Sequence, residues 1–162
     1  MDLHTRIQQA VIHAVSNLLE AMVPMGFEAS ENQASSIDFV GDYLLGMIQV
    51  QGKLTGSITV SAPSHLAISM TEAMLEEEVK DLNDDVYETI AEVTNIIAGG
   101  IKTFLSQQEE IFSLGLPQVL ELKGGRKLPD DKQRMVVPIK TEKGSFFVMS
   151  TLFESVVDEQ PQ

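Results

Sequence analysis

Glu92 and Asn95 lie three residues apart in the stretch Asp84–Gln108, which has the apolar spacing of one long helix. Residues three apart on a helix are neighbours on its surface, so the carboxylate and the carboxamide would project side by side. A carboxamide carries both a hydrogen-bond donor and an acceptor, and it can therefore position a water molecule. A carboxylate forms a charge-assisted pair with a cation. The two groups are thus suited to orienting water while holding a cationic group of a partner.

Two sets of residues recur at helical spacing within this stretch, and they fall on opposite sides of the helix. The apolar set predicts the face that packs on the core: Val86, Ile90, Val93, Ile97, Ile101 and Phe104. The small and polar set predicts the solvent face: Glu88, Glu92, Asn95, Gly99 and Lys102, flanked by Ala91 and Ala98. The candidate chemistry therefore lies on the side of the helix that faces away from the core.

A polar helix face is usually only solvated surface, but three features of this one argue against that interpretation. Glu88 and Glu92 are like charges four residues apart, which destabilises a helix by roughly 0.2–0.5 kcal/mol. Asn95 is a poor helix former in mid-helix. Gly99 and Gly100 each cost about 1 kcal/mol relative to alanine. A face selected for stability alone would carry alanines and Glu–Lys pairs.

The run Glu92–Gly99, EVTNIIAG, resembles the ExxN signature of the CheC/CheX/FliY chemotaxis phosphatases, and CheX is the most similar type. Pro117, which follows the helix, fits the same family. A strand over residues 54–61 that is followed by Pro63 and a short helix also fits. The resemblance extends over residues 1–155, for which we expect a single CheX-like domain, with a loose tail over 156–162.

The sequence departs from the family pattern in two places. Glu88 stands where the family usually has Asp or Ser, and the spacing from Asn95 to Pro117 is shorter by one residue. A second ExxN, which CheC-type relatives carry on their first helix, is missing here, because Ala14 stands three residues before Asn17. The resemblance therefore implies a single site, as in CheX.

The resemblance implies a phosphatase that hydrolyses the phospho-aspartate of a CheY-type response regulator. Glu92 and Asn95 would be its catalytic residues: Asn95 would orient the attacking water, and Glu92 would bind the active-site lysine of the regulator. The residues that would contact the partner are Glu88, Ala91, Gly99 and Lys102. No cofactor of its own is implied, since the Mg²⁺ would belong to the regulator. The family further implies a homodimer.

Two other functions stay open. The chain is alternatively an acidic adaptor that docks a response regulator or a flagellar switch component without hydrolysis, or a plain dimerisation module. Phosphate release from a phosphorylated regulator separates the first function from both of these. A hydrolase that uses its own metal is disfavoured, because three scattered His and no Cys offer no ligand spacing.

Composition restricts the classes of partner. The net charge of −13 argues against binding to nucleic acid and to anionic membrane surfaces. No Gly-rich phosphate loop of the usual spacing is present. No apolar run approaches the ~18 residues of a membrane span, and residues 1–4 do not resemble the start of a signal peptide, so we expect a cytoplasmic protein. A chain of 162 residues suits one domain with a substantial core.

The remaining patterns predict the elements that position this helix. Helices are predicted over residues 3–22 and 64–75, the second with Pro63 in its first turn. One or two short strands are predicted within 27–40, a hairpin over 43–50 and 54–61 with a two-residue turn at Gly52-Lys53, short strands around Pro117, and a closing hairpin over 135–140 and 145–152. Loops are predicted at 124–125 and 129–132. This order predicts an α/β (α+β) fold, a two-layer domain with a largely antiparallel sheet packed against long helices.

Overall fold

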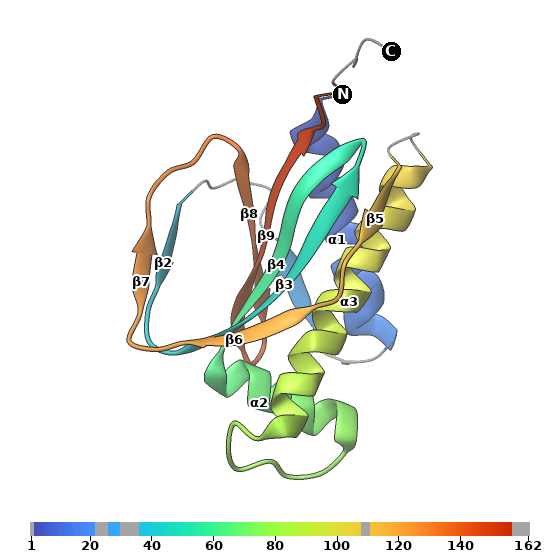
Figure 1. Cartoon of the computed structure of the whole chain (residues 1–162). Coiled ribbons are helices and arrows are strands. Elements are labelled where there is room, and N and C mark those ends of the chain that lie inside the picture. The colour runs from blue at the N-terminus through green and yellow to red at the C-terminus, as the bar shows by residue number, and fades with distance from the viewer. Residues whose placement is uncertain (1, 22–25, 30–35, 108–110, 157–162) are drawn as a thin grey trace.

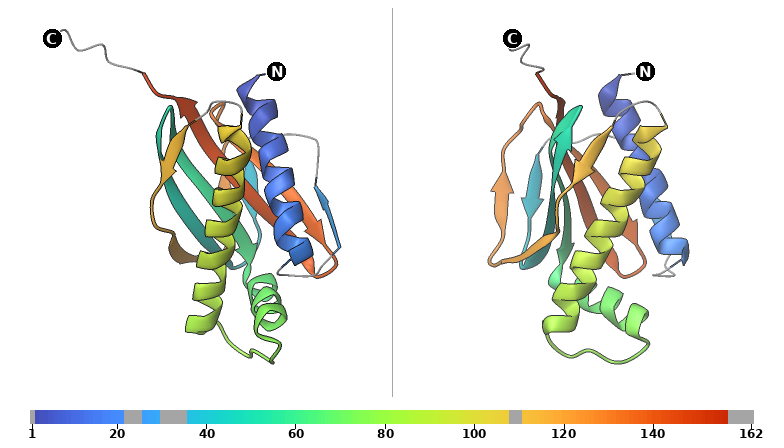
Figure 2. Two further views of the ribbon diagram at one scale, coloured as in Figure 1. Left: turned by 90° about the vertical axis from the view of Figure 1, so that its right-hand side faces the viewer. Right: turned by 45° about the vertical axis from the view of Figure 1, so that its right-hand side comes forward.

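The computed structural model describes residues 2–21, 26–29, 36–107 and 111–156. Helices α1 (Leu3–Ala21) and α3 (Asp84–Ser106) run side by side in opposite directions across one face of a sheet (Figures 1 and 2). Helix α2 (Ser64–Leu75) closes one end of the domain (Figure 1). The predicted two-layer architecture is therefore confirmed.

The main sheet is antiparallel throughout its described pairings. Its strands are β1 (Phe27–Ala29), β3 (Tyr43–Gly52), β4 (Leu54–Pro63), β5 (Phe112–Leu114), β6 (Gln118–Leu122), β8 (Arg134–Thr141) and β9 (Gly144–Glu154). They follow the order β1-β8-β9-β4-β3, and both β5 and β6 pair with the free side of β3. Strands β2 (Ile37–Phe39) and β7 (Arg126–Leu128) form a separate two-stranded ribbon.

The principal core fills the space between the helices and the sheet. Leu44, Ile48 and Val50 alternate along β3 and are buried, as the period of two requires for a strand with one covered face. The apolar stripes of α1 and α3 pack onto this face, and burying each large aliphatic side chain contributes about 1.5–3 kcal/mol. The core is thus built from the apolar periodicities that the sequence displays.

Helix α3 begins with a standard cap. The Asn83 side chain accepts a hydrogen bond from the Val86 amide at 3.1 Å, and Asp84 and Asp85 stand in the first turn. Both features stabilise a helix start, because they satisfy a free N–H and place negative charge at the positive end of the helix dipole. The helix ends at Ser106; residue 108, the predicted end, lies outside the described residues.

Several local predictions need correction. Strand β7 lies between the two predicted loops and was missed, because its three residues form a strand only through their pairing with β2. In the β3–β4 hairpin the paired residues are placed symmetrically about Lys53. The turn is therefore not the two-residue turn at Gly52-Lys53 that was predicted. Pro63 is the N-cap of α2 rather than a residue of its first turn. Pro138 lies in β8 next to Ile139, the residue at which the pairing with β1 ends.

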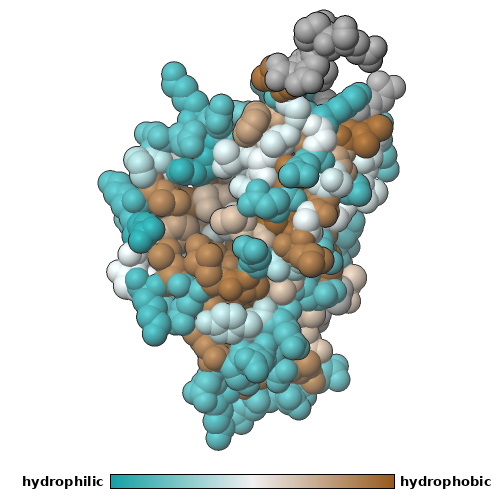
Figure 3. All heavy atoms as spheres, in the orientation of Figure 1, coloured by the Kyte–Doolittle hydropathy of each residue, from teal (hydrophilic) through white to brown (hydrophobic). Residues whose placement is uncertain are grey.

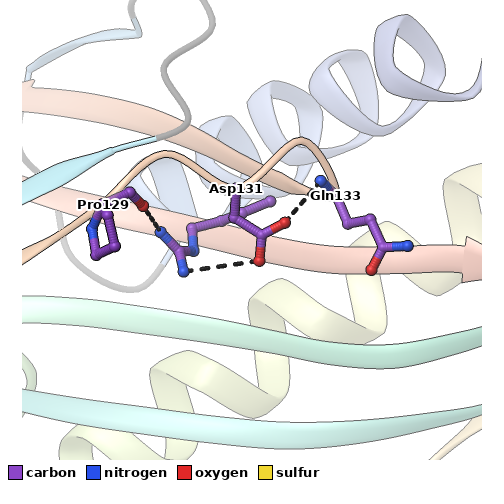
Figure 4. A network of polar contacts seen from close by, with 4 residues as sticks. Pro129, Asp131 and Gln133 are labelled. Carbon is purple, nitrogen blue, oxygen red and sulfur yellow. Dashed lines mark hydrogen bonds and ion pairs between the residues drawn. The ribbon is translucent and has the colours of Figure 1, made fainter.

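The loop that joins β7 to β8 is closed by its own polar contacts (Figure 4). The Asp131 carboxylate accepts a hydrogen bond from the Gln133 amide at 2.9 Å and lies 3.8 Å from the Arg134 guanidinium. Arg134 in turn donates to the Pro129 carbonyl at 2.8 Å. These contacts fix the path by which the chain returns from the β2–β7 ribbon to the main sheet.

The face of the sheet opposite α1 and α3 carries a second, smaller apolar cluster. The β2–β7 ribbon covers part of it, with Ile37 and Phe39 buried against Tyr43 and Val136. The Phe39 and Tyr43 rings meet edge to face with their centroids 4.9 Å apart, and burial raises the pKa of Tyr43 above its ordinary value. Figure 3 shows apolar side chains gathered beside the ribbon.

Candidate functional site

Helix α3 is held against β3 by a glycine. A Cβ atom on Gly46 would overlap the Thr94 hydroxyl and would lie 3.2 Å from the Ile90 Cγ2, so the helix approaches the strand closely at this point. Thr94 is fully buried, and its hydroxyl donates to the Ile90 carbonyl at 2.6 Å. Because successive residues of a helix are rotated by about 100°, this contact turns Asn95 away from the sheet.

On its other side α3 packs against α1. A Cβ on Gly100 would lie 2.7 Å from the Ala14 Cβ, and Ala14 is only 2% exposed. Gly100 therefore serves helix packing. Gly99 differs, because a Cβ built there meets no atom within 4 Å. The two interior glycines thus have separate roles, and only Gly99 contributes open backbone to the polar face.

The structure places the predicted polar residues on one exposed face of α3. Glu88, Glu92 and Asn95 are exposed, and Gly99 follows on the same side of the helix. The predicted partner residues Ala91 and Lys102 are half-buried at its margin. Ala98, predicted to flank the face, is fully buried and belongs to the main core.

The two carboxylates and the carboxamide of this face project from α3 without a polar partner in the described part of the chain. Among the described residues, no hydrogen bond or ion pair engages the side chains of Glu88, Glu92 or Asn95. Two like charges therefore stand one turn apart without compensation, a destabilising arrangement in an isolated helix. A cation brought by a partner would relieve that repulsion.

The margins of the face come from two other elements. On the β6 side, the Tyr87 hydroxyl donates to the Glu121 carboxylate at 3.4 Å. Burial raises the pKa of Tyr87 above its ordinary value, and the negative charge of Glu121 adds to the shift. On the α1 side, the His13 ring lies 5.5 Å from the Phe104 ring. Sequence patterns did not indicate these margins, since the residues involved are far apart in the chain.

Ala14 of α1 stands where a second ExxN would have its Glu. It faces α3, so an acidic side chain at this position would be buried in the helix–helix contact. Asn17 is exposed, and its amide lies 3.4 Å from the His13 ring nitrogen Nε2. The packing of the two helices therefore places Ala14 in their contact and leaves Asn17 at the surface.

The described residues contain no group of three or more His, Asp or Glu side chains placed to hold a metal ion. Glu76, Glu77 and Glu78 are exposed at the end of α2, where Glu76 takes a left-handed conformation with φ 55° and its amide donates to the Glu72 carbonyl at 2.8 Å. This acidic run is the C-terminal cap of a helix. In the described part of the chain, no helix combines the length and the apolar character needed to cross a bilayer.

Solved structures share this fold over nearly the whole chain. A CheC-like superfamily protein from Shewanella sp. PV-4 is 20% identical with a TM-score of 0.79, covering 94% of this chain and 99% of its own. The chemotaxis protein CheX from Vibrio vulnificus is 21% identical with a TM-score of 0.79, covering 91% and 99%. The CheX–CheY–BeF₃–Mg²⁺ complex from Borrelia burgdorferi is 20% identical with a TM-score of 0.66, covering 90% and 97%.

No curated protein sequence matches the chain. Residues 44–140 match the family model described as chemotaxis phosphatase CheX, and this span contains β3, β4, α2 and all of α3 with its exposed Glu92 and Asn95. Since the match covers more than half of the sequence and the fold agrees, the chain belongs to the CheX family of chemotaxis phosphatases.

Proposed function

We propose that this protein hydrolyses the phospho-aspartate of a CheY-type response regulator, with Glu92 and Asn95 of α3 as its catalytic residues. The observation that carries the proposal is an exposed carboxylate and carboxamide one turn apart, neither bound to another described residue, in a member of the chemotaxis phosphatase family. In Borrelia burgdorferi, a CheX of this fold forms a complex with CheY, BeF₃ and Mg²⁺, which supports a CheY-type partner here.

Asn95 has the chemistry to position the attacking water. Its amide oxygen accepts a hydrogen bond from the water, and its NH₂ donates to a phosphoryl oxygen or to the water. The water oxygen then forms a bond to phosphorus as the bond from phosphorus to the aspartyl oxygen breaks. Aspartate leaves as a carboxylate, and inorganic phosphate retains the protons of the water. Such a transfer relies mainly on alignment and on stabilisation of charge.

Glu92 has the chemistry to fix the partner. Its carboxylate would accept a charge-assisted hydrogen bond from the active-site lysine of the regulator, one turn away from Asn95. Along the same face, Glu88 adds negative charge and Lys102 adds positive charge nearer the end of α3. Gly99 and Ala91 keep the intervening surface low, which allows two backbones to approach closely.

We place the Mg²⁺ in the regulator, where it would neutralise the charge on the phosphoryl oxygens. The absence of a suitable donor cluster among the described residues supports this placement. The experiment is to follow phosphate release from a phosphorylated regulator with and without this protein, and again after EDTA is added. We expect the protein to accelerate release and EDTA to stop it, while calorimetry of the protein alone detects no tight Mg²⁺ binding.

Unchanged phosphate release in the presence of a bound complex would contradict the phosphatase proposal and favour the adaptor alternative. Stoichiometric, tight binding of Mg²⁺ or Mn²⁺ to the isolated protein would contradict the placement of the metal. The two experiments are independent, because phosphate release measures turnover and calorimetry measures metal binding.

We also propose that the protein is a homodimer formed by pairing of sheet edges. β1 pairs with β8 from Thr141 to Ile139, and no other described strand pairs with residues 135–138 of β8 on that side. Such an edge can accept a strand from a second chain. Light scattering should give twice the chain mass of 17.8 kDa at micromolar concentration. The monomer mass across that range would refute the proposal.

A further inference from the structure

The bend between β5 and β6 holds an apolar side chain outward at the margin of the α3 face. Leu116 is 88% exposed, although it stands between two strands that both pair with β3. The bend is anchored on one side by the pair Val50–Leu114 and on the other by Met47–Gln118. The Gly115 amide also donates to the Gln49 carbonyl at 2.9 Å. Leu116 therefore projects from a fixed backbone.

This bend lies next to α3, as Figures 1 and 2 show from different directions. Strands β5 and β6 both contact the helix, and Leu114 and Val119, which flank the bend, pack against the core. A partner that covers the exposed face of α3 would therefore extend over the bend.

Exposed apolar side chains that are scattered singly are common and carry no meaning by themselves. Two properties distinguish Leu116. Its backbone is fixed before any partner binds, so little conformational entropy is lost when the side chain is buried. Its place in a bend beside α3, the helix that carries Glu92 and Asn95, also matches the anatomy of protein interfaces, in which an apolar anchor adjoins charged groups.

We propose that Leu116 is an apolar anchor for the regulator that docks on α3. The proposal rests on the proposed function and specifies the surface of the partner. Opposite Glu88 and Glu92 the partner presents a cation, and beside that cation it presents an apolar depression that receives Leu116. The anchor contributes to docking equally in the ground state and the transition state, so it governs KM and Kd rather than kcat.

Leu116→Ser is the variant that tests the anchor, and Val40→Ser is its matched control. Val40 is 79% exposed and directly follows β2, and β2 lies on the opposite side of the domain from α3 (Figure 1). We expect Leu116→Ser to raise both the Kd for a BeF₃-loaded regulator with Mg²⁺ and the KM for dephosphorylation by about 10–100-fold, as burial of one leucine predicts. Saturating kcat and the melting temperature should stay at wild-type values, Leu116→Met should bind as wild type, and Val40→Ser should change nothing.

A wild-type Kd for Leu116→Ser overturns the anchor, as does an equal loss of binding in Val40→Ser or a fall in kcat with Kd unchanged. The proposed function fails by a different readout, namely wild-type turnover in Asn95→Ala. Measuring Kd and turnover separately therefore shows which of the two proposals is wrong.

Discussion

Replacing Asn95 with alanine is expected to lower the rate of phospho-regulator decay by about 10²–10³-fold, the usual effect of removing one well-placed donor that acts in the transition state. Docking should persist, because the interaction of Asn95 with water forms mainly as the phosphoryl bond breaks. The melting temperature should stay the same or rise slightly, since Asn95 is exposed and is a poor helix former. Single-turnover decay, regulator binding and thermal unfolding measure the three quantities separately.

Glu92→Ala provides the comparison. Glu92 is exposed and repels Glu88, so its removal should also leave stability near the wild-type value. Its carboxylate is proposed to bind the lysine of the partner, and we therefore expect weaker docking together with slower turnover. If both variants keep wild-type decay rates, the α3 face is only solvated surface. If both melt far below wild type, the face contributes to the fold in a way that its exposure does not indicate.

A large loss of stability is expected for Gly46→Ala. The new Cβ would overlap the Thr94 hydroxyl, which is fully buried and bonded to the Ile90 carbonyl at 2.6 Å. Neither group can move aside without breaking that hydrogen bond or shifting α3 from β3. Overpacking of this kind lowers the free energy of unfolding by about 1–3 kcal/mol. For a domain of this size, that corresponds to a drop in melting temperature of roughly 2–12 °C.

Gly99→Ala is the matched control for this effect. It makes the same substitution on the exposed side of α3, where a Cβ meets no atom within 4 Å. Alanine is the better helix former, so stability should rise by about 1 kcal/mol. Chemical denaturation of both variants measures the difference. A Gly46→Ala protein as stable as wild type would show that α3 is not packed tightly on β3.

The glycines of α3 show where sequence-based prediction reaches its limit. Both Gly99 and Gly100 stand out as unfavourable in a helix, because propensity depends on residue type alone. Which of them faces α1 depends on how two helices distant in sequence pack, and Gly100 meets Ala14 while Gly99 stays open. The full burial of Ala98, which flanks the polar face, is likewise decided by tertiary packing.

Periodicity by itself determined the long amphipathic helix, its exposed Glu92 and Asn95, helix α2 and both hairpins, because each depends on residues that are close in sequence. Tertiary structure alone decided strand β7, which exists by pairing with β2. It also decided that Leu116 stands beside α3, since both strands that hold the bend pair with β3, more than 60 residues earlier in the chain. Contacts over such separations leave no periodic signal, and they complete the surface around the site.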